Sequence, residues 1–163
     1  STLFPYTTLF RSLRYDAVTA STTDGAGRTY GDGLPRREEL VALYDAVGWG
    51  VYTRDPDNLE RAVRQSLWVS TARDARGQLV GLVRVVGDDA TIAWVQDLLV
   101  HPDHQRQGVG TALLRAALER FAHVRQLALL TDSQEATLAF YRSLGLLPAQ
   151  ALGTCCYVRD TAS

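Results

Sequence analysis

HQRQGVGTALL, residues 104–114, carries the strongest signal in this chain. Gly108 and Gly110 follow a run of polar residues, and a helix-like apolar pattern comes after them. A helix that begins here presents unpaired backbone N–H groups and the positive end of its dipole, and the two together bind anions. The glycines let a phosphate approach the backbone, and Arg106 adds a charge-assisted contact. The turn therefore predicts a pyrophosphate site; the alternative is a helix start without a ligand.

Two common nucleotide-binding motifs do not match this turn. A P-loop requires a lysine, and the sequence contains none, since all 17 basic residues are arginines. A dinucleotide-binding fingerprint requires a third glycine, but Leu113 stands at that position. A nicotinamide-dinucleotide fold is therefore the weakest alternative.

Composition and charge narrow the classes of partner. A chain of 163 residues, 46% of them hydrophobic, suffices for one domain with one core. Its net charge is −1 and it has no apolar run of about 20 residues, so we expect neither a nucleic-acid nor a membrane partner. Cys155 and Cys156 are adjacent, which is not a metal-binding spacing. We expect no metal, and reduced thiols in a cytoplasmic protein; the lack of lysine is typical of a GC-rich bacterial genome.

The N-terminal segment reads differently from the rest. TLFPYTTLFRS, residues 2–12, resembles the in-frame translation of a sequencing adapter, and residue 1 is not methionine. We therefore expect residues 1–12 to be an artefact outside the fold, and residues 13–163 to form a single domain. The alternative is a genuine apolar N-terminal strand.

Hydrophobic periodicity predicts an alternation of helices and strands after a Gly-rich loop over 13–34 with a short edge strand near 28–32. This order fits an α/β (α+β) fold, a three-layer αβα sandwich with a mixed, mostly antiparallel central sheet and helices on both faces. The unit over 91–131 should be a parallel crossover. The expected helices are 35–48, a second one capped by Asp57 or Asn58, 109–122 and 133–144, and the expected strands are 68–72, 79–86, 91–100, 126–131 and 154–158.

These elements and motifs resemble the GNAT superfamily of N-acetyltransferases. The family's coenzyme A motif, Gln/Arg-x-x-Gly-x-Gly/Ala, is similar to QRQGVG at 105–110, which follows the strand VQDLLV at 95–100. LTDSQEATLAFYRSLGLLP at 130–148 resembles the family's closing helix, and ELVALYDAVGWGVY at 39–52 resembles a bacterial branch whose first helix ends in Gly-Trp. The resemblance implies an acyl-CoA N-acyltransferase fold. It is compatible with either a monomer or a homodimer.

The resemblance also implies a reaction and a set of residues. Acetyl-CoA would be the acyl donor, and the primary amine of a small molecule the acceptor. Tyr141 matches the tyrosine that donates a proton to the departing thiolate, although a core aromatic is the alternative. Residues implied to bind coenzyme A are Gln105, Arg106, Gln107, Gly108, Val109, Gly110 and Thr111 in the loop, Leu98, Leu99 and Val100 along the pantetheine arm, and Gln134, where many relatives have Asn.

The sequence defines the general base and the acceptor-binding residues less well. Asp97, on the strand beside the expected acetyl slot, is the candidate base, with an ordinary polar strand residue as the alternative. Trp49 and Tyr52 would form an aromatic wall for the acceptor, with Asp55 or Asp57 attracting a cation, unless these residues only pack and cap helices. The apolar stretch LALLT at 127–131 lacks the Glu of ribosomal-protein acetyltransferases. This absence argues against a peptide N-terminus as the acceptor. Peptide acetylation and non-catalytic acyl-CoA binding are the alternatives to the small-molecule reaction.

Overall fold

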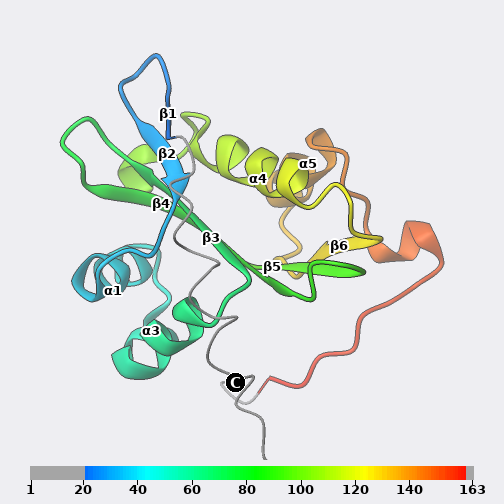
Figure 1. Cartoon of the computed structure of the whole chain (residues 1–163). Coiled ribbons are helices and arrows are strands. Elements are labelled where there is room, and N and C mark those ends of the chain that lie inside the picture. The colour runs from blue at the N-terminus through cyan, green and yellow to red at the C-terminus, as the bar shows by residue number, and fades with distance from the viewer. Residues whose placement is uncertain (1–20, 161–163) are drawn as a thin grey trace, which may run out of the picture.

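The computed structural model describes residues 21–160, which form a mixed sheet with helices on both faces (Figure 1). The expectations for residues 1–12 and for the boundaries of a domain over 13–163 lie outside the described residues. No helix in the described range is long and apolar enough to span a membrane.

The strands of the described sheet lie side by side in chain order. All neighbouring pairs are antiparallel except β5 and β6, which run parallel and are joined through α4. This confirms the expected mixed, mostly antiparallel sheet and its parallel crossover. The strands are β1 (Thr22–Thr23), β2 (Thr29–Asp32), β3 (Trp68–Arg73), β4 (Leu79–Gly87), β5 (Ile92–Val100) and β6 (Gln126–Leu129).

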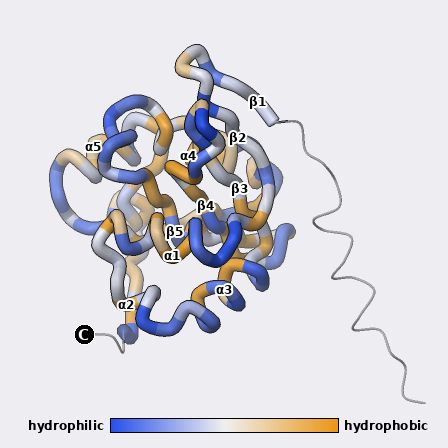
Figure 2. Tube along the Cα trace, turned by 90° about the vertical axis from the view of Figure 1, so that its left-hand side faces the viewer, coloured by the Kyte–Doolittle hydropathy of each residue, from blue (hydrophilic) through white to orange (hydrophobic). Residues whose placement is uncertain are grey.

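Helices cover the two faces of the sheet, with α4 and α5 on one side and α1 and α3 on the other (Figure 1). Each side buries its own apolar cluster against the strands. Figure 2 shows the hydrophobic segments gathered along the central strands and hydrophilic ones on the outer side of α3. The helices are α1 (Arg37–Ala46), α2 (Gly50–Thr53), α3 (Pro56–Arg64), α4 (Val109–Arg120) and α5 (Glu135–Ser143), with short 3-10 turns at Pro102–His104 and Ala149–Leu152.

Helix α4 lies close against the sheet because β4 has a glycine beneath it. A Cβ atom on Gly81 would lie 2.9 Å from side-chain carbons of both Val109 and Leu113. Such a distance is shorter than any ordinary packing contact, so Gly81 allows the first turns of α4 to rest directly on the strand. This contact fixes the position of the helix N-terminus relative to β5.

Helix α3 begins earlier than the sequence indicated. Asp55, and not Asp57 or Asn58, is its N-cap, because the Asp55 carboxylate accepts a hydrogen bond of 3.0 Å from the Asn58 backbone N–H. Pro56 occupies the first helical position, where its missing N–H costs nothing. The prediction overlooked this pairing of an Asp cap with a following proline.

A β-bulge interrupts the ladder between β4 and β5. Arg84 pairs with Asp97, but the next residue, Val85, pairs with Val95, so Gln96 is the extra residue. A bulge adds one residue to the strand and thereby exchanges the faces on which its side chains lie. On one side of it Val95 packs beneath α4, whereas Leu99 beyond it packs on the α1 side.

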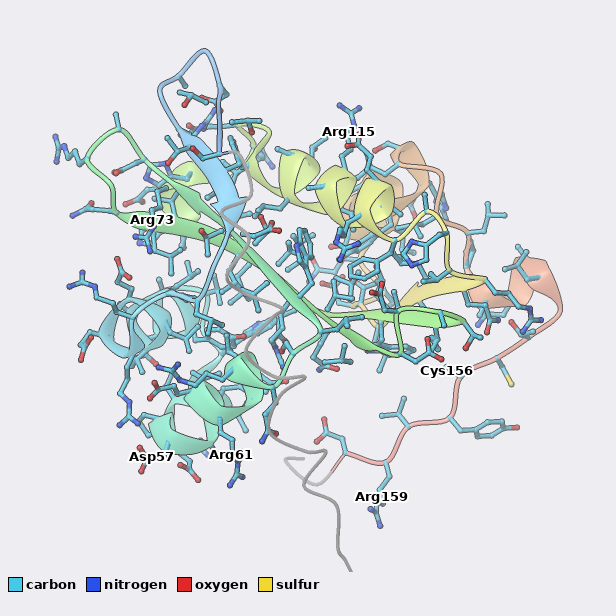
Figure 3. All side chains as sticks on the ribbon, viewed as in Figure 1. Asp57, Arg61, Arg73, Arg115, Cys156 and Arg159 are labelled. Atoms are coloured by element: carbon cyan, nitrogen blue, oxygen red, sulfur yellow. The ribbon has the colours of Figure 1, made fainter. Side chains whose placement is uncertain are left out.

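The predicted last strand, 154–158, is wrong. Residues 154–160 have no regular structure, and Tyr157 is 93% exposed. After α5 the chain turns at Gly145 and again through Ala149–Leu152, and it then runs away from the edge of β6 (Figure 1). Without a neighbouring strand the apolar pattern forms no ladder. Cys155 and Cys156 are free, exposed thiols, and the side chain of Cys156 points away from the fold (Figure 3).

Candidate active site

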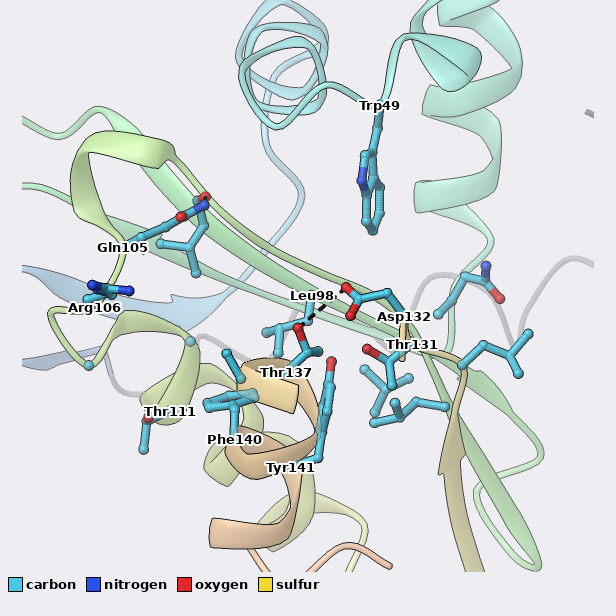
Figure 4. Close-up of a pocket in the computed structure, with 18 residues that line it drawn as sticks. Trp49, Leu98, Gln105, Arg106, Thr111, Thr131, Asp132, Thr137, Phe140 and Tyr141 are labelled. Carbon is cyan, nitrogen blue, oxygen red and sulfur yellow. Dashed lines mark hydrogen bonds between the residues drawn. The ribbon is translucent and has the colours of Figure 1, made fainter. Parts of the chain in front are cut away.

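A cavity of about 600 Å³ lies where β5 and β6 separate (Figure 4). The two strands pair only from Ile92–Val95 against Gln126–Leu129, and β5 then continues alone to Val100. The gap is closed by the N-terminal ends of α4 and α5. The lining residues are Trp49, Val95, Gln96, Leu98, Val100, Gln105, Arg106, Gly108, Gly110, Thr111, Leu129, Leu130, Thr131, Asp132, Ala136, Thr137, Phe140 and Tyr141.

One end of this cavity is built to receive an anion. The first turn of α4 contains no acidic residue and no side-chain cap, and the first helical hydrogen bond runs from the Ala112 N–H to the Gly108 carbonyl at 2.9 Å. The N–H groups of residues 109–111 therefore have no partner within the helix. Arg106 and Gly108 both adopt left-handed backbone conformations, with φ of 60° and 85°, and both line the cavity. The helix dipole and the Arg106 guanidinium favour a phosphate here.

Gln107 supports the turn from outside the cavity. The Arg28 guanidinium donates to the Gln107 side-chain oxygen at 3.1 Å and to its backbone carbonyl at 3.0 Å, while Gln107 donates to the Asp103 carbonyl at 3.0 Å. Asp24 in turn holds Arg28 at 2.8 Å. Gln107 thus joins the turn to the β1–β2 hairpin. Sequence reasoning missed Arg28, because it lies 79 residues from its partner.

The strand leading to the turn divides its residues between cavity and core. Leu98 and Val100 line the cavity, whereas Leu99 and Val109 are buried in the two apolar clusters. The Gln105 side chain donates to the Val100 carbonyl at 3.0 Å and so ties the turn to the end of β5. Leu99 and Val109 therefore position this end of the cavity without lining it.

Substitution of Gly110 tests whether a ligand binds in the cavity at this turn. A Cβ atom there would meet Val100 at 3.5 Å and Phe140 at 3.8 Å, which are ordinary contacts. We expect Gly110→Ala to leave the melting temperature unchanged, because the protein itself has room for the methyl group. The same methyl group would occupy the cavity beside the N–H groups, so we expect the KM for acetyl-CoA to rise about tenfold or more.

Thermal unfolding and initial rates with and without the substitution check this expectation. An unchanged KM for acetyl-CoA in a folded Gly110→Ala protein would show that the turn does not contact the donor.

Tyr141 reaches into the cavity from α5 (Figure 4). Its ring packs edge-on against Phe140 at 5.0 Å between centroids. Burial raises the pKa of the Tyr141 phenol; the side chain of Thr131 acts in the opposite direction, and the nearby Asp132 charge raises it further. The phenol therefore keeps its proton at neutral pH and is able to donate it. Gln134 is the α5 N-cap and does not line the cavity.

Asp97 does not reach the cavity. Its Oδ2 atom lies 2.5 Å from the Arg84 Nε and 2.6 Å from the Tyr44 hydroxyl, and the residue is only 1% exposed. The bulge at Gln96 turns Asp97 toward α1, so Gln96 faces the cavity in its place. The burial and the ion pair favour a structural role for Asp97 over that of a base for an acceptor in the cavity.

The residues expected to bind the acceptor are not all brought to this cavity. Trp49 lines the cavity, whereas Tyr52 does not; the Tyr52 ring lies 5.9 Å from the Trp49 ring and 5.6 Å from the Tyr44 ring. Asp55 caps α3, and Asp57 forms an ion pair with Arg37 on the outer surface. Neither carboxylate lines this cavity. The carboxylate that does so, Asp132, follows β6 and was overlooked by sequence reasoning.

The two histidines of the turn lie elsewhere. His101 and His104 stack edge-on at 6.0 Å and line a second depression beside α1. The His101 ring accepts a hydrogen bond of 3.2 Å from the Asp103 N–H. Neither histidine lines the cavity that contains Tyr141. Among residues 21–160, no group of three or more His, Cys, Asp or Glu side chains is placed to hold a metal ion.

Comparison with known proteins gives concordant matches. The Acetyltransferase (GNAT) family profile matches residues 26–146. The chain is 34% identical over 121 residues to the histone acetyltransferase TAP1 of Glycine max, covering 66% of this chain and 50% of that protein. It is 26% identical over 112 residues to an uncharacterized N-acetyltransferase, ycf52, of Pyropia yezoensis, covering 67% of this chain and 63% of that protein.

A solved structure, a GNAT-family acetyltransferase of Streptococcus pneumoniae, is 34% identical and superposes with a TM-score of 0.73 over 82% of this chain and 98% of that one. The chain spans 50% and 63% of the two curated relatives. These relatives come from a plant and an alga, so the bacterial branch stays a prediction. Since the family profile covers most of its length, the chain belongs to the GNAT acetyltransferase family.

Proposed function

We propose that this chain transfers the acetyl group of acetyl-CoA to the primary amine of a small molecule by direct attack within one cavity. One observation carries the proposal: the same cavity is lined by the uncapped N-terminal turn of α4 with Arg106 and by the protonated phenol of Tyr141. A thioester that carries a pyrophosphate needs a site for its phosphates at one end and a proton donor for its sulfur at the other. Family membership supports the same reaction.

The residues that would hold the donor fit its chemistry. Arg106 and the N–H groups of Gly110 and Thr111 would bind the pyrophosphate, and Leu98 and Val100 would contact the pantetheine arm. Acetyl-CoA brings an acetyl group that is activated as a thioester. The cavity of about 600 Å³ is of the size that small-molecule sites usually have.

Tyr141 would supply the proton that the leaving sulfur needs. The amine nitrogen forms a bond with the carbonyl carbon, the carbon–sulfur bond breaks, and the sulfur takes the phenolic proton. The surplus proton of the nitrogen passes to solvent, and the phenol regains its proton from water. A phenol with a raised pKa is well suited to this role, because it remains protonated until the sulfur develops charge.

A protein acceptor is the second candidate. The soybean relative is named a histone acetyltransferase, which favours testing peptides as well. Non-catalytic acyl-CoA binding is the third possibility, and Tyr141 in the cavity argues against it. For the location we propose the cytoplasm, a reducing compartment, in keeping with the two free exposed thiols.

A thiol-release screen tests the proposal. Acetyl-CoA and the protein are mixed with polyamines, amino acids, aminoglycosides and peptides, and free coenzyme A is measured over time. We expect steady release with at least one small amine. Release with peptides alone would favour the protein acceptor, and tight acetyl-CoA binding without release across the panel would favour a sensing role.

A further inference from the structure

Asp132 places a carboxylate in the cavity at a fixed position. It lies in the loop between β6 and α5, and its side chain points into the cavity (Figure 4). Its Oδ1 atom accepts a hydrogen bond of 2.9 Å from the Gln134 N–H, and its Oδ2 atom accepts one of 3.4 Å from the Thr137 hydroxyl. These bonds leave acceptor capacity on both oxygens, because a carboxylate has about four lone-pair sites.

The charges that line the cavity have opposite signs at its two ends. Arg106 and Asp132 are the charged residues among those that line it. Figure 4 shows Arg106 beside the α4 turn and Asp132 at the far side, beyond Tyr141. The Arg106 end suits the phosphates of the donor. The Asp132 end suits a positively charged group, and the remaining substrate, the acceptor, is the one that would bring it.

Trp49 provides a second cation-binding feature on the opposite wall. Its ring hangs into the cavity and faces Asp132 across the open space (Figure 4). The Tyr44 and Tyr52 rings hold it at 6.1 and 5.9 Å, and Tyr44 is itself anchored by its hydrogen bond to Asp97. A tryptophan face is the best aromatic partner for an organic cation. A fixed carboxylate and a fixed indole therefore enclose one end of the cavity.

The charge that binds there is not that of the reacting nitrogen. A carboxylate stabilises the protonated form of an amine beside it, and a protonated amine has no lone pair with which to attack. Asp132 also lies at the exposed rim of the cavity, whereas Tyr141 is half-buried. Since the reacting nitrogen must approach the carbonyl carbon bonded to the sulfur that Tyr141 serves, the rim is left for the other end of the acceptor.

We infer that Asp132 and Trp49 form a subsite for a second cationic group of the acceptor, so that the substrate class is a small diamine or a longer polyamine. This inference rests on the proposed acetyl transfer. It adds that the cavity distinguishes acceptors by the charge at the end that does not react.

A matched pair of acceptors tests the inference. Diaminobutane and aminobutanol have the same carbon chain and reacting amine, but aminobutanol has a hydroxyl in place of the second ammonium. We expect the wild type to prefer diaminobutane by about tenfold in kcat/KM, which corresponds to about 1.4 kcal/mol. Asp132→Asn should abolish this preference, because the amide oxygen still accepts from the Gln134 N–H while the charge is gone. The KM for acetyl-CoA should not change.

Glu135→Gln is the control, because it removes one negative charge from the neighbouring first turn of α5 at a side chain that is 80% exposed and does not line the cavity. It should keep the preference. Equal use of both amines by the wild type, or an intact preference in Asp132→Asn, would overturn the inference. So would turnover confined to acceptors with one charge.

Calorimetric titration of the coenzyme A-saturated protein with each amine supplies a readout independent of turnover. If no acceptor is acetylated, the proposed function fails. Tighter binding of diaminobutane that is lost in Asp132→Asn would even then support the subsite, and equal binding of the two amines would refute it.

Discussion

We expect Tyr141→Phe to lower kcat by about a hundredfold while the affinity for acetyl-CoA stays within about twofold, since general acid catalysis contributes about 10²–10⁴ in rate. The substitution removes only the hydroxyl, and the ring keeps its contact with Phe140. The pyrophosphate end of the cavity is untouched by this change. Initial rates at saturating acceptor, together with a binding titration of acetyl-CoA, measure the two effects separately.

The same account sets a pH dependence. A general acid is active while protonated, so activity is lost as the pH rises through its pKa. Burial raises the pKa of Tyr141 above its ordinary value of 10.0, so the limb of kcat due to this group should lie above pH 10 in the wild type. Tyr157→Phe is the matched control for Tyr141→Phe, because it removes a hydroxyl from a tyrosine that is 93% exposed on the C-terminal segment. Wild-type turnover in Tyr141→Phe would remove the acid role.

Asp97→Ala should cost about 3–5 kcal/mol of unfolding free energy, because it leaves Arg84 charged and unpaired at 6% exposure. Burial and the Asp97 charge also raise the pKa of Tyr44, which therefore stays a hydrogen-bond donor to the carboxylate and loses its acceptor in this variant. Urea denaturation followed by circular dichroism measures the loss.

Two further variants separate this cause from others. The double substitution Arg84→Met with Asp97→Leu should recover most of the stability, since it removes both charges together. Asp57→Ala, which breaks the exposed pair with Arg37, should leave the urea midpoint nearly unchanged, because solvent screens that pair. If Asp97→Ala were as stable as the wild type and had lost kcat alone, Asp97 would regain its place as the base.

Local sequence patterns predicted most of the helices and strands, but not always the face of a strand on which a side chain lies. The apolar positions of α4 and the glycines of its turn are local signals, so the helix and the place where it begins followed from the sequence. Asp97 did not, because strict alternation from Val95 would place both side chains on one face of β5. The extra residue, Gln96, reverses that outcome, and its presence depends on the register with β4, which the β5 sequence does not contain.

The remaining differences also have a non-local cause. Residues 154–158 have a strand-like composition, but whether a strand forms depends on a neighbouring edge that the preceding turns avoid. Asp132 was overlooked although a signal existed, since ligand-binding residues often follow the carboxyl ends of parallel strands and β6 is one.

A two-substrate initial-rate study tests the central claim, direct transfer within one cavity, most directly. With the acceptor identified by the screen, acetyl-CoA and amine are varied together. The account predicts intersecting double-reciprocal lines and no acetylated protein by mass spectrometry, since both substrates meet in the cavity and its lining residues include no cysteine. Parallel lines together with an acetylated side chain would contradict it, because they would require a covalent intermediate on the chain.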